Sequence, residues 1–223
     1  MKRYALIVAG GSGKRMGPGI PKQFLEISGK PVLMRTIERF RSFDQSIIII
    51  LVIPADQYGY WEELCRKYSF RVPHTIVAGG PTRFDSVRNG LEKIGEKCLV
   101  AIHDGVRPNV SSGTIKRCFD TAGKFGNAVP VVEPADSVRI ITEQGNMPVK
   151  RHDLRIVQTP QVFDSELIKK AYLQEYNPDF TDDATLLEKT GETINLVEGN
   201  RENLKITNRG DIEIAETLFR NIF

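Results

Sequence analysis

Cationic side chains gather around a glycine turn near the start of the chain. The first 25 residues hold five cations and no carboxylate, and the turn, residues 10–16, directly follows an apolar run. Lys14 and Arg15 lie in the turn, and Lys22 follows it after Pro21. Glycines let backbone N–H groups approach an anion closely, and the three cations add mobile positive charge. The pattern predicts a site for several phosphates, because its charge exceeds what one phosphate requires.

Two familiar phosphate loops do not match this segment. The P-loop pattern requires a hydroxyl residue after its lysine, but Lys14 is followed by Arg15. The dinucleotide fingerprint, started at Gly11, has Met16 where its third glycine belongs. A glycine turn beneath a solvated basic face is the structural alternative. The convergence of three cations on the end of a first strand favours a phosphate site.

A series of motifs extends over nearly the whole chain. They are Gly11-x-Gly13-x-Arg15-Met16 with Pro21-Lys22-Gln23, Gly79-Gly80-x-x-Arg83-x-x-Ser86-Val87, His103-Asp104-x-x-Arg107-Pro108, Gln158-Thr159-Pro160-Gln161-x-Phe163, Thr181-Asp182-Asp183, and Val197-Glu198-Gly199 followed by Asn203-x-Lys205-x-Thr207. The first resembles the signature loop of nucleotidyltransferases that make nucleoside-diphosphate sugars and alditols. In this order, the set resembles the 2-C-methyl-D-erythritol 4-phosphate cytidylyltransferase family.

The resemblance implies a reaction between two anions. CMP would pass from CTP to 2-C-methyl-D-erythritol 4-phosphate, with release of pyrophosphate, in non-mevalonate isoprenoid biosynthesis. A phosphate monoester has a second pKa of about 6, so its oxygen is ionised at neutral pH and can attack the α-phosphorus without a general base. The transition state is more negative than either substrate. Catalysis is therefore expected to depend on positioning, preorganised cations and a metal.

By resemblance, the catalytic residues are Arg15, Lys22 and Lys205. Arg15 and Lys22 would contact the CTP triphosphate, and Lys205 would lie between the phosphates of the two substrates. Asp104 matches the family's Mg²⁺ ligand, and one carboxylate with phosphate oxygens and water suits this cofactor. The plain alternatives are a solvated lysine after a proline, a carboxylate that caps a turn, and a surface lysine on an edge strand.

The resemblance also assigns residues to each substrate. Those for CTP are Gly11, Gly13, Gly79, Gly80 and Ser86. Those for the acceptor's phosphate and hydroxyls are Arg107, Arg151, Thr159 and Thr181. Two further motif residues are expected to be structural: His103 has no second His or Cys at metal spacing, and Asp183 is expected to cap the following helix.

Two other functions compete with this reading. A ribitol 5-phosphate cytidylyltransferase would share nearly every motif, and departures from the commonest family pattern at Gly105-Val106, Ser137 and Arg155 fall around the acceptor pocket. Its acceptor differs by a methyl and a carbinol, which a pocket discriminates only modestly. A catalytically silent nucleotide-binding module is the second alternative. It would not need cations on both sides of the α-phosphorus.

Alternating strands and helices must position these residues. Strands are predicted at 4–9, 47–53, 72–78 and 99–103, with helices after Pro31, over 56–68, and along the stripe of Phe84, Val87, Leu91 and Ile94. The alternation predicts an α/β fold, a Rossmann-like three-layer sandwich with a mostly parallel sheet. Ligands of such sheets bind beyond the carboxyl ends of the strands, where Gly10 and Asp104 would both lie.

Residues 131–158 interrupt the alternation. Residues 137–141 alternate polar with apolar, 143–146 supply a turn, and 147–150 can return as a second strand. A two-stranded ribbon is marginal in water, and the resemblance implies a β-arm that clasps a second subunit in a homodimer. Arg151 would then reach the neighbouring site. A hairpin folded back on its own domain is the alternative. We expect one nucleotidyltransferase domain over 1–223 with this arm inserted.

Composition is that of an ordinary globular enzyme, with 40% hydrophobic and 26% charged residues. The net charge of +3 is too small to indicate a nucleic-acid partner. Cys65, Cys98 and Cys118 are widely spaced and indicate neither a disulfide framework nor a zinc site. The first apolar run ends at Gly10, too early for a signal sequence or a membrane span. We expect a cytoplasmic protein without a membrane partner.

Overall fold

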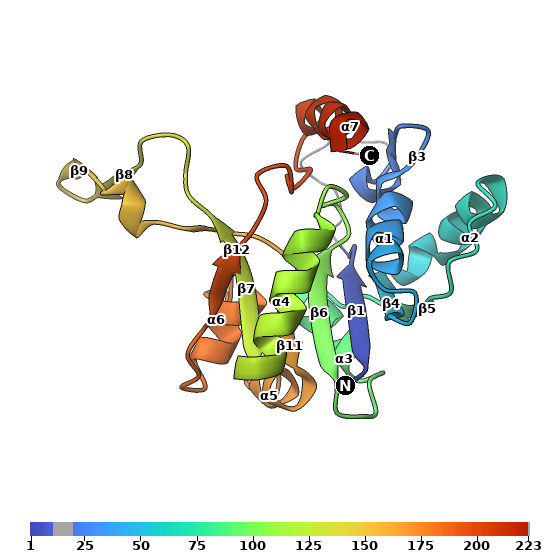
Figure 1. Cartoon of the computed structure of the whole chain (residues 1–223), viewed down its shortest axis with the longest axis horizontal. Coiled ribbons are helices and arrows are strands. Elements are labelled where there is room, and N and C mark those ends of the chain that lie inside the picture. The colour runs from blue at the N-terminus through green and yellow to red at the C-terminus, as the bar shows by residue number, and fades with distance from the viewer. Residues whose placement is uncertain (11–19, 223) are drawn as a thin grey trace.

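The computed structural model describes residues 1–10 and 20–222 and is built around a sheet of eight strands (Figure 1). The strands are β1 Arg3–Val8, β4 Ile48–Ile53, β5 Thr75–Ala78, β6 Leu99–Asp104, β7 Asn127–Val132, β10 Ile156–Val157, β11 Gln161–Asp164 and β12 Leu196–Glu198. Their order is β10-β7-β11-β6-β1-β4-β5, and β12 pairs with β7. The pairs β5-β4, β4-β1, β1-β6 and β7-β12 are parallel, whereas β10 and β11 run antiparallel to their neighbours.

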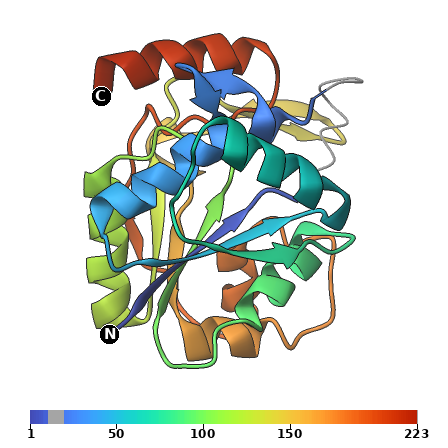
Figure 2. The same cartoon turned by 90° about the vertical axis from the view of Figure 1, so that its right-hand side faces the viewer.

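Helices cover both faces of the sheet, which gives three layers (Figures 1 and 2). One face carries α1 Val32–Phe43, α2 Tyr58–Lys67 and α4 Ser112–Phe125, and the other carries α3 Arg83–Leu91, α5 Ser165–Ala171 and α6 Asp183–Glu188. Helix α7, Gly210–Ile222, lies across one end of the molecule against β2, Glu26–Ile27, which pairs with β3, Lys30–Pro31. The predicted three-layer sandwich with a mostly parallel sheet is confirmed.

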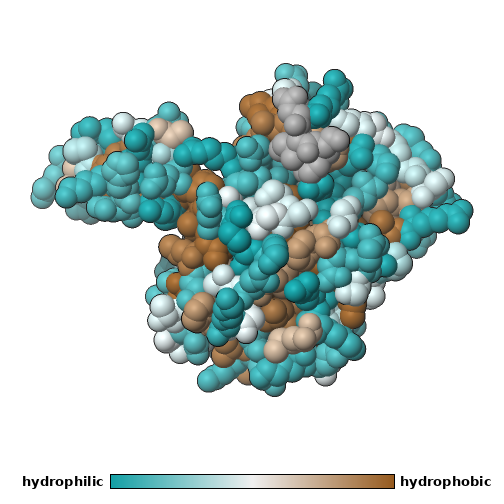
Figure 3. Space-filling model, in the orientation of Figure 1, coloured by the Kyte–Doolittle hydropathy of each residue, from teal (hydrophilic) through white to brown (hydrophobic). Residues whose placement is uncertain are grey.

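A hairpin protrudes from this body. Strands β8, Arg139–Thr142, and β9, Gly145–Pro148, pair with each other and with no other strand that the structure describes. Figure 3 shows them in a separate, largely hydrophilic lobe beside the main body. The hairpin is therefore an arm and does not fold back on its own domain. Its predicted bounds were too wide, since Val131 and Val132 belong to β7 and Ile156–Val157 forms β10.

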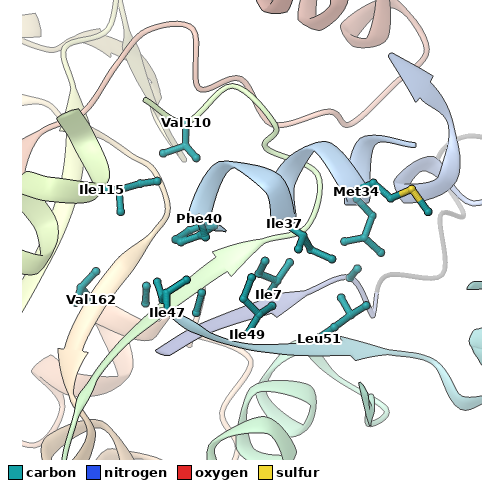
Figure 4. Packing of buried hydrophobic residues seen from close by; sticks show 14 of the residues in the cluster. Ile7, Met34, Ile37, Phe40, Ile47, Ile49, Leu51, Val110, Ile115 and Val162 are labelled. Carbon is teal, nitrogen blue, oxygen red and sulfur yellow. The ribbon is translucent and has the colours of Figure 1, made fainter. Parts of the chain in front are cut away.

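The core explains why the central strands are apolar on both sides. Successive residues of β1 enter different clusters: Ile7 packs with α1, α2 and α4, and Leu6 packs with α3, α5 and α6. Figure 4 shows Ile7 and Leu51 beneath Ile37 of α1. The side chains of Leu6, Ile7, Ile37 and Leu51 are fully buried. Burial of each one stabilises the fold by about 1.5–3 kcal/mol. The apolar runs at 4–9 and 47–53 thus follow from two covered faces.

Three element boundaries differ from the predicted ones. Pro31 precedes α1 as its N-cap residue and is not in the first turn. The helix predicted over 56–68 begins as a short 3-10 turn, η3 Ala55–Gln57, before α2. The strand predicted from residue 72 begins only at Thr75. Pro73 has no N–H to donate, so pairing with β4 starts beyond it.

Two expectations drawn from composition can be compared with the structure. Cys65, Cys98 and Cys118 are free thiols. Among residues 1–10 and 20–222, no helix combines the length and the apolar character that a bilayer crossing needs.

Candidate active site

Two clefts meet at the carboxyl edge of the parallel strands. The glycine-side cleft, about 340 Å³, is lined by Val8, Ala9, Gly10, Lys22, Gln23, Pro81, Thr82, Arg83, Ser86, Asp104, Val106 and Lys205. The threonine-side cleft, about 220 Å³, is lined by Arg83, Asp104, Arg107, Val157, Gln158, Thr159, Gln161, Thr181, Asp182 and Lys205. Arg83, Asp104 and Lys205 line both clefts, so they form a shared wall between two binding spaces.

Asp104 is the centre of this wall, at the last position of β6. Its Oδ2 atom lies 3.0 Å from Arg107 Nε and 3.1 Å from Lys205 Nζ, and its Oδ1 atom lies 3.9 Å from Arg83 Nε. Burial alone would raise the pKa of the Asp104 carboxyl, but the charges of Lys205, Arg83 and Arg107 outweigh it and hold this pKa well below its usual range. Asp104 is therefore an anion throughout the neutral range.

Lys205 reaches the wall from a segment near the C-terminus. Its neighbour Ile206 is fully buried against Ile27, Val32 and Val106, and the Ile206 N–H donates to the Val106 carbonyl at 3.0 Å. The segment is not a strand, but one backbone hydrogen bond and one buried side chain fix it. The neighbouring Lys205 side chain points away from the core and toward Asp104.

Lys22 lines the glycine-side cleft from a turn near the N-terminus. It begins the 3-10 turn η2, Lys22–Phe24, which directly follows Pro21. The next side chain, Gln23, is buried and donates to the Ala9 carbonyl at 3.2 Å, which attaches the turn to the end of β1. Lys22 is thereby held where the first strand opens into the cleft. Gly11, Gly13 and Arg15, predicted for the same loop, lie outside the described residues.

A buried histidine is connected to Asp104 through the hydroxyl of Thr159. His103 Nε2 donates to the Arg107 carbonyl at 3.1 Å, so the ring accepts at Nδ1, where the Thr159 hydroxyl donates at 3.0 Å. The Thr159 oxygen accepts the Asp104 N–H at 3.1 Å. Burial lowers the pKa of His103 to about 4, which keeps the ring neutral. His103 is thus structural, as expected, and the only proton of the Thr159 hydroxyl is already donated.

Ser86 organises the glycine turn at the start of α3. Its hydroxyl accepts the Gly80 N–H at 3.1 Å and donates to the Thr82 carbonyl at 2.9 Å. A Cβ atom on Gly80 would lie 2.3 Å from Asp85 Cβ, and one on Gly10 would lie 3.0 Å from Ser86 Oγ. The backbone that follows β1 and the backbone that follows β5 therefore both lie close to the start of α3. Gly79 lies in the same turn, and its N–H donates to the Ile53 carbonyl at 2.8 Å.

The predicted acceptor residues separate into two groups. Arg107, Thr159 and Thr181 line the threonine-side cleft, where Arg107 also donates to the Asn203 carbonyl at 2.8 Å. Arg151 does not line either cleft. It lies in the 3-10 turn η4, Arg151–Asp153, at the base of the arm, and donates to the Ala135 carbonyl at 2.9 Å.

The prediction that Asp183 caps α6 is wrong. The cap is Asp182, whose side chain accepts the Thr185 N–H at 2.8 Å from an extended backbone. Asp183 is fully buried and binds Arg83 through both oxygens, at 2.9 and 2.6 Å. Asp183 and Arg83 are a hundred positions apart. Arg83 was noted within its motif but given no role, because no local pattern reveals this pair.

A metal at this wall would have one protein carboxylate. No group of three His, Cys, Asp or Glu side chains suited to a metal occurs in the described part of the chain. Mg²⁺ is commonly held by one or two carboxylates together with substrate phosphates and water. Asp104 Oδ1 lies 3.9 Å from Arg83 Nε, beyond hydrogen-bond reach, and Asp104 lines both clefts. The donor set therefore fits Mg²⁺ bound together with a nucleotide.

A larger groove of about 830 Å³ lies elsewhere, along β7 and β12 near the base of the arm. It is lined by Val131, Val132, Glu133, Arg155, and residues 196–202. None of the described residues predicted to bind a substrate or the metal lies in it, but Arg155, which was expected around the acceptor pocket, lines this groove instead. We therefore place the chemistry in the two smaller clefts, where the charged groups converge.

Comparison with known proteins agrees with this geometry. The family model of 2-C-methyl-D-erythritol 4-phosphate cytidylyltransferase matches residues 4–221. Proteins of that name from Bacteroides fragilis and Bacteroides thetaiotaomicron are 53% and 48% identical to the chain over 218 residues, which is 98% of this chain and 100% of each relative. The crystal structure of 4-diphosphocytidyl-2C-methyl-D-erythritol synthase from Anaerococcus prevotii superposes with a TM-score of 0.83 at 29% identity, covering 98% of this chain and 96% of that one. The chain therefore belongs to the 2-C-methyl-D-erythritol 4-phosphate cytidylyltransferase family.

Proposed function

We propose that this chain transfers CMP from CTP to 2-C-methyl-D-erythritol 4-phosphate and releases pyrophosphate. The observation that carries the proposal is the shared wall of Arg83, Asp104 and Lys205 between two clefts. A transfer between two anionic substrates requires one point at which their phosphates meet and cations surround them. Membership of the family and identity near 50% over nearly the full chain support this acceptor.

CTP occupies the glycine-side cleft in this proposal, with Lys22 and the loop containing Arg15 on its triphosphate. The acceptor occupies the threonine-side cleft, where Arg107 offers a permanent charge to its phosphate. An oxygen of that phosphate attacks the α-phosphorus of CTP as the bond to the pyrophosphate oxygen breaks. Lys22 and Lys205 stabilise the added negative charge from opposite sides. No side chain needs to remove a proton, because the attacking oxygen is already ionised.

Mg²⁺ is the cofactor we propose, with Asp104 as its protein ligand. The carboxylate is ionised, and the 3.9 Å between its Oδ1 atom and Arg83 Nε is too long for a hydrogen bond, which supports the assignment. The ion would supply further positive charge to the triphosphate. The protein orients the ligand: Arg107 and Lys205 bind Oδ2 and so fix the orientation of the carboxylate.

Pyrophosphate release tests the proposed function directly. The chain should release pyrophosphate from CTP and Mg²⁺ only when 2-C-methyl-D-erythritol 4-phosphate is present, and much more slowly with ribitol 5-phosphate. Faster release with ribitol 5-phosphate would establish the alternative acceptor. CTP binding without release in the presence of either acceptor would identify a silent nucleotide-binding module.

We further propose that the protein acts as a homodimer in the cytoplasm. The arm exposes Ile140, Ile141 and Met147, whose exposed fractions are 50%, 79% and 54%, and an isolated ribbon gains stability by packing against another surface. Arg151 lies at the base of the arm and outside its own clefts, as a residue that serves a neighbouring site would. Free thiols support a reducing compartment. The proposed partners are thus the two substrates and a second copy of the chain.

Mixing two inactive variants, Arg151→Ala and Lys22→Ala, should restore activity. In a dimer with crossed arms, a mixed pair has one site with both defects and one site with neither. Random exchange makes about half of the dimers mixed, so activity should approach about a quarter of wild type. The rate is measured before and after exchange, and exchange is verified with differently tagged subunits. Lack of recovery after verified exchange would place Arg151 in its own subunit's site, and a monomer in sedimentation would remove the arm proposal.

A further inference from the structure

Arg83 forms its hydrogen bonds with Asp183 and not with Asp104, although Arg83 and Asp104 line the same wall. Both terminal nitrogens of Arg83 bind Asp183, at 2.9 and 2.6 Å, whereas Nε lies 3.9 Å from Asp104 Oδ1. A bidentate arginine–carboxylate pair is strong and has a fixed orientation. Arg83 thus contributes positive potential to the wall without a hydrogen bond to Asp104.

Asp183 is itself held in place. It is fully buried at the start of α6, and the Tyr172 hydroxyl donates to its Oδ1 at 2.5 Å. Asp182, the preceding residue, caps the helix and accepts from Gln161 Nε2 at 2.9 Å. These contacts fix Asp183 through its side chain and through the preceding residue. It can therefore act as a rigid anchor for the guanidinium.

The surrounding cations bind one oxygen of Asp104 more closely than the other. Arg107 and Lys205 both bind Oδ2, at 3.0 and 3.1 Å. Arg83 Nε lies 3.9 Å from Oδ1, and Asp183 binds the two terminal nitrogens of Arg83. A guanidinium without Asp183 would face Asp104 as its nearest carboxylate. A short rotation would then place a third cation on the carboxylate and cover Oδ1.

We propose that Asp183 is a positioning residue that restrains Arg83 and thereby keeps Asp104 Oδ1 open to a metal-bound nucleotide. The inference deepens the proposed function, because it rests on Asp104 as the metal ligand. It assigns a role to Asp183, a buried carboxylate that lines neither cleft. Asp183 also attaches the segment that carries Thr181 to the start of α3, so the two clefts keep one common wall.

Nucleotide binding without catalysis tests this proposal. The affinity for α,β-methylene-CTP, which cannot transfer CMP, is measured by calorimetry with and without Mg²⁺ and in the absence of acceptor. The gain in affinity from Mg²⁺ should fall about tenfold in Asp183→Asn, the scale typical of losing a residue that supports a metal ligand. The double variant Arg83→Gln/Asp183→Asn should recover most of the gain, because the released cation is then absent.

The double variant distinguishes a restraint of Arg83 by Asp183 from a general loss of packing around Asp183. A gain in Asp183→Asn equal to wild type, or a double variant as weak as the single one, would overturn the proposal. Arg88→Gln, which removes an exposed arginine of α3 paired with Asp85, is the matched control and should change nothing. If circular dichroism shows that Asp183→Asn is unfolded, Tyr172→Phe is used in its place. A smaller fall in the affinity gained from Mg²⁺ would then support the proposal, and an unchanged gain would contradict it. Failure of the wild-type chain to bind the analogue would instead count against the proposed function.

Discussion

Replacing Lys22 by alanine should lower kcat by about a hundredfold or more while the KM for CTP changes little. A cationic contact that strengthens only in the transition state contributes on the order of 2.7–4 kcal/mol to the rate. Lys22 is suited to this role because it lines the glycine-side cleft together with Asp104 and Lys205, where we propose that the α-phosphate of CTP binds. Steady-state kinetics with CTP varied at saturating acceptor measure both constants.

Lys67→Ala is the matched control for this variant. Lys67 is an exposed lysine at the end of α2 that pairs with Glu26 and lines neither cleft, so its loss should leave both constants unchanged. If Lys22→Ala raises only the KM for CTP, Lys22 binds the ground state and the proposed transition-state role is wrong.

Replacing Asp104 by asparagine should remove most activity together with the response to Mg²⁺ and leave the fold intact. The amide keeps the shape of the side chain but carries no charge to hold a divalent cation. The fold should survive, because Arg107 also binds the Asn203 carbonyl and Arg83 binds Asp183. Activity is measured over a range of Mg²⁺ concentrations, and folding is checked by circular dichroism. A variant with a normal Mg²⁺ response would move the metal elsewhere, and Asp182 on the threonine-side cleft would be tested next.

The sheet and the edge of the site could be predicted from the sequence because their signals are local. An apolar run without alternation indicates a strand buried on both faces, as β1 and β4 are. Parallel strands end at a common edge, so Gly10 and Asp104 had to lie near each other. In the structure, Gly105 N–H donates to the Val8 carbonyl at 2.8 Å, which joins the ends of β6 and β1.

The Arg83–Asp183 pair could not be predicted in the same way. It depends on the packing of α6 beside α3, which no short motif records. Two adjacent acids at the start of α6 are equivalent in a capping pattern, and only the extended backbone of Asp182 decides which one caps. The buried member of the pair then needs a charged partner, since an unpaired buried carboxylate is costly.

The bounds of the arm were predicted less well than its existence. Alternation indicates a ribbon, but exposed strands lack the buried face that fixes register and length. The structure moves the first strand to Arg139–Thr142 and starts the second at Gly145. Val157, included in the predicted arm, instead pairs with Val131 of β7. The residues that flank the arm in β7 and β10 are apolar, and their pattern does not show where the sheet ends and the arm begins.

A crystal structure of the chain with CTP and Mg²⁺ tests the central claim most directly. We expect the triphosphate in the glycine-side cleft, with the α-phosphate beside Lys22 and Lys205 and the metal on Asp104 Oδ1. Arg83 should keep both contacts to Asp183 in that complex. A nucleotide bound in the groove between β7 and β12, or a metal that does not touch Asp104, would contradict it.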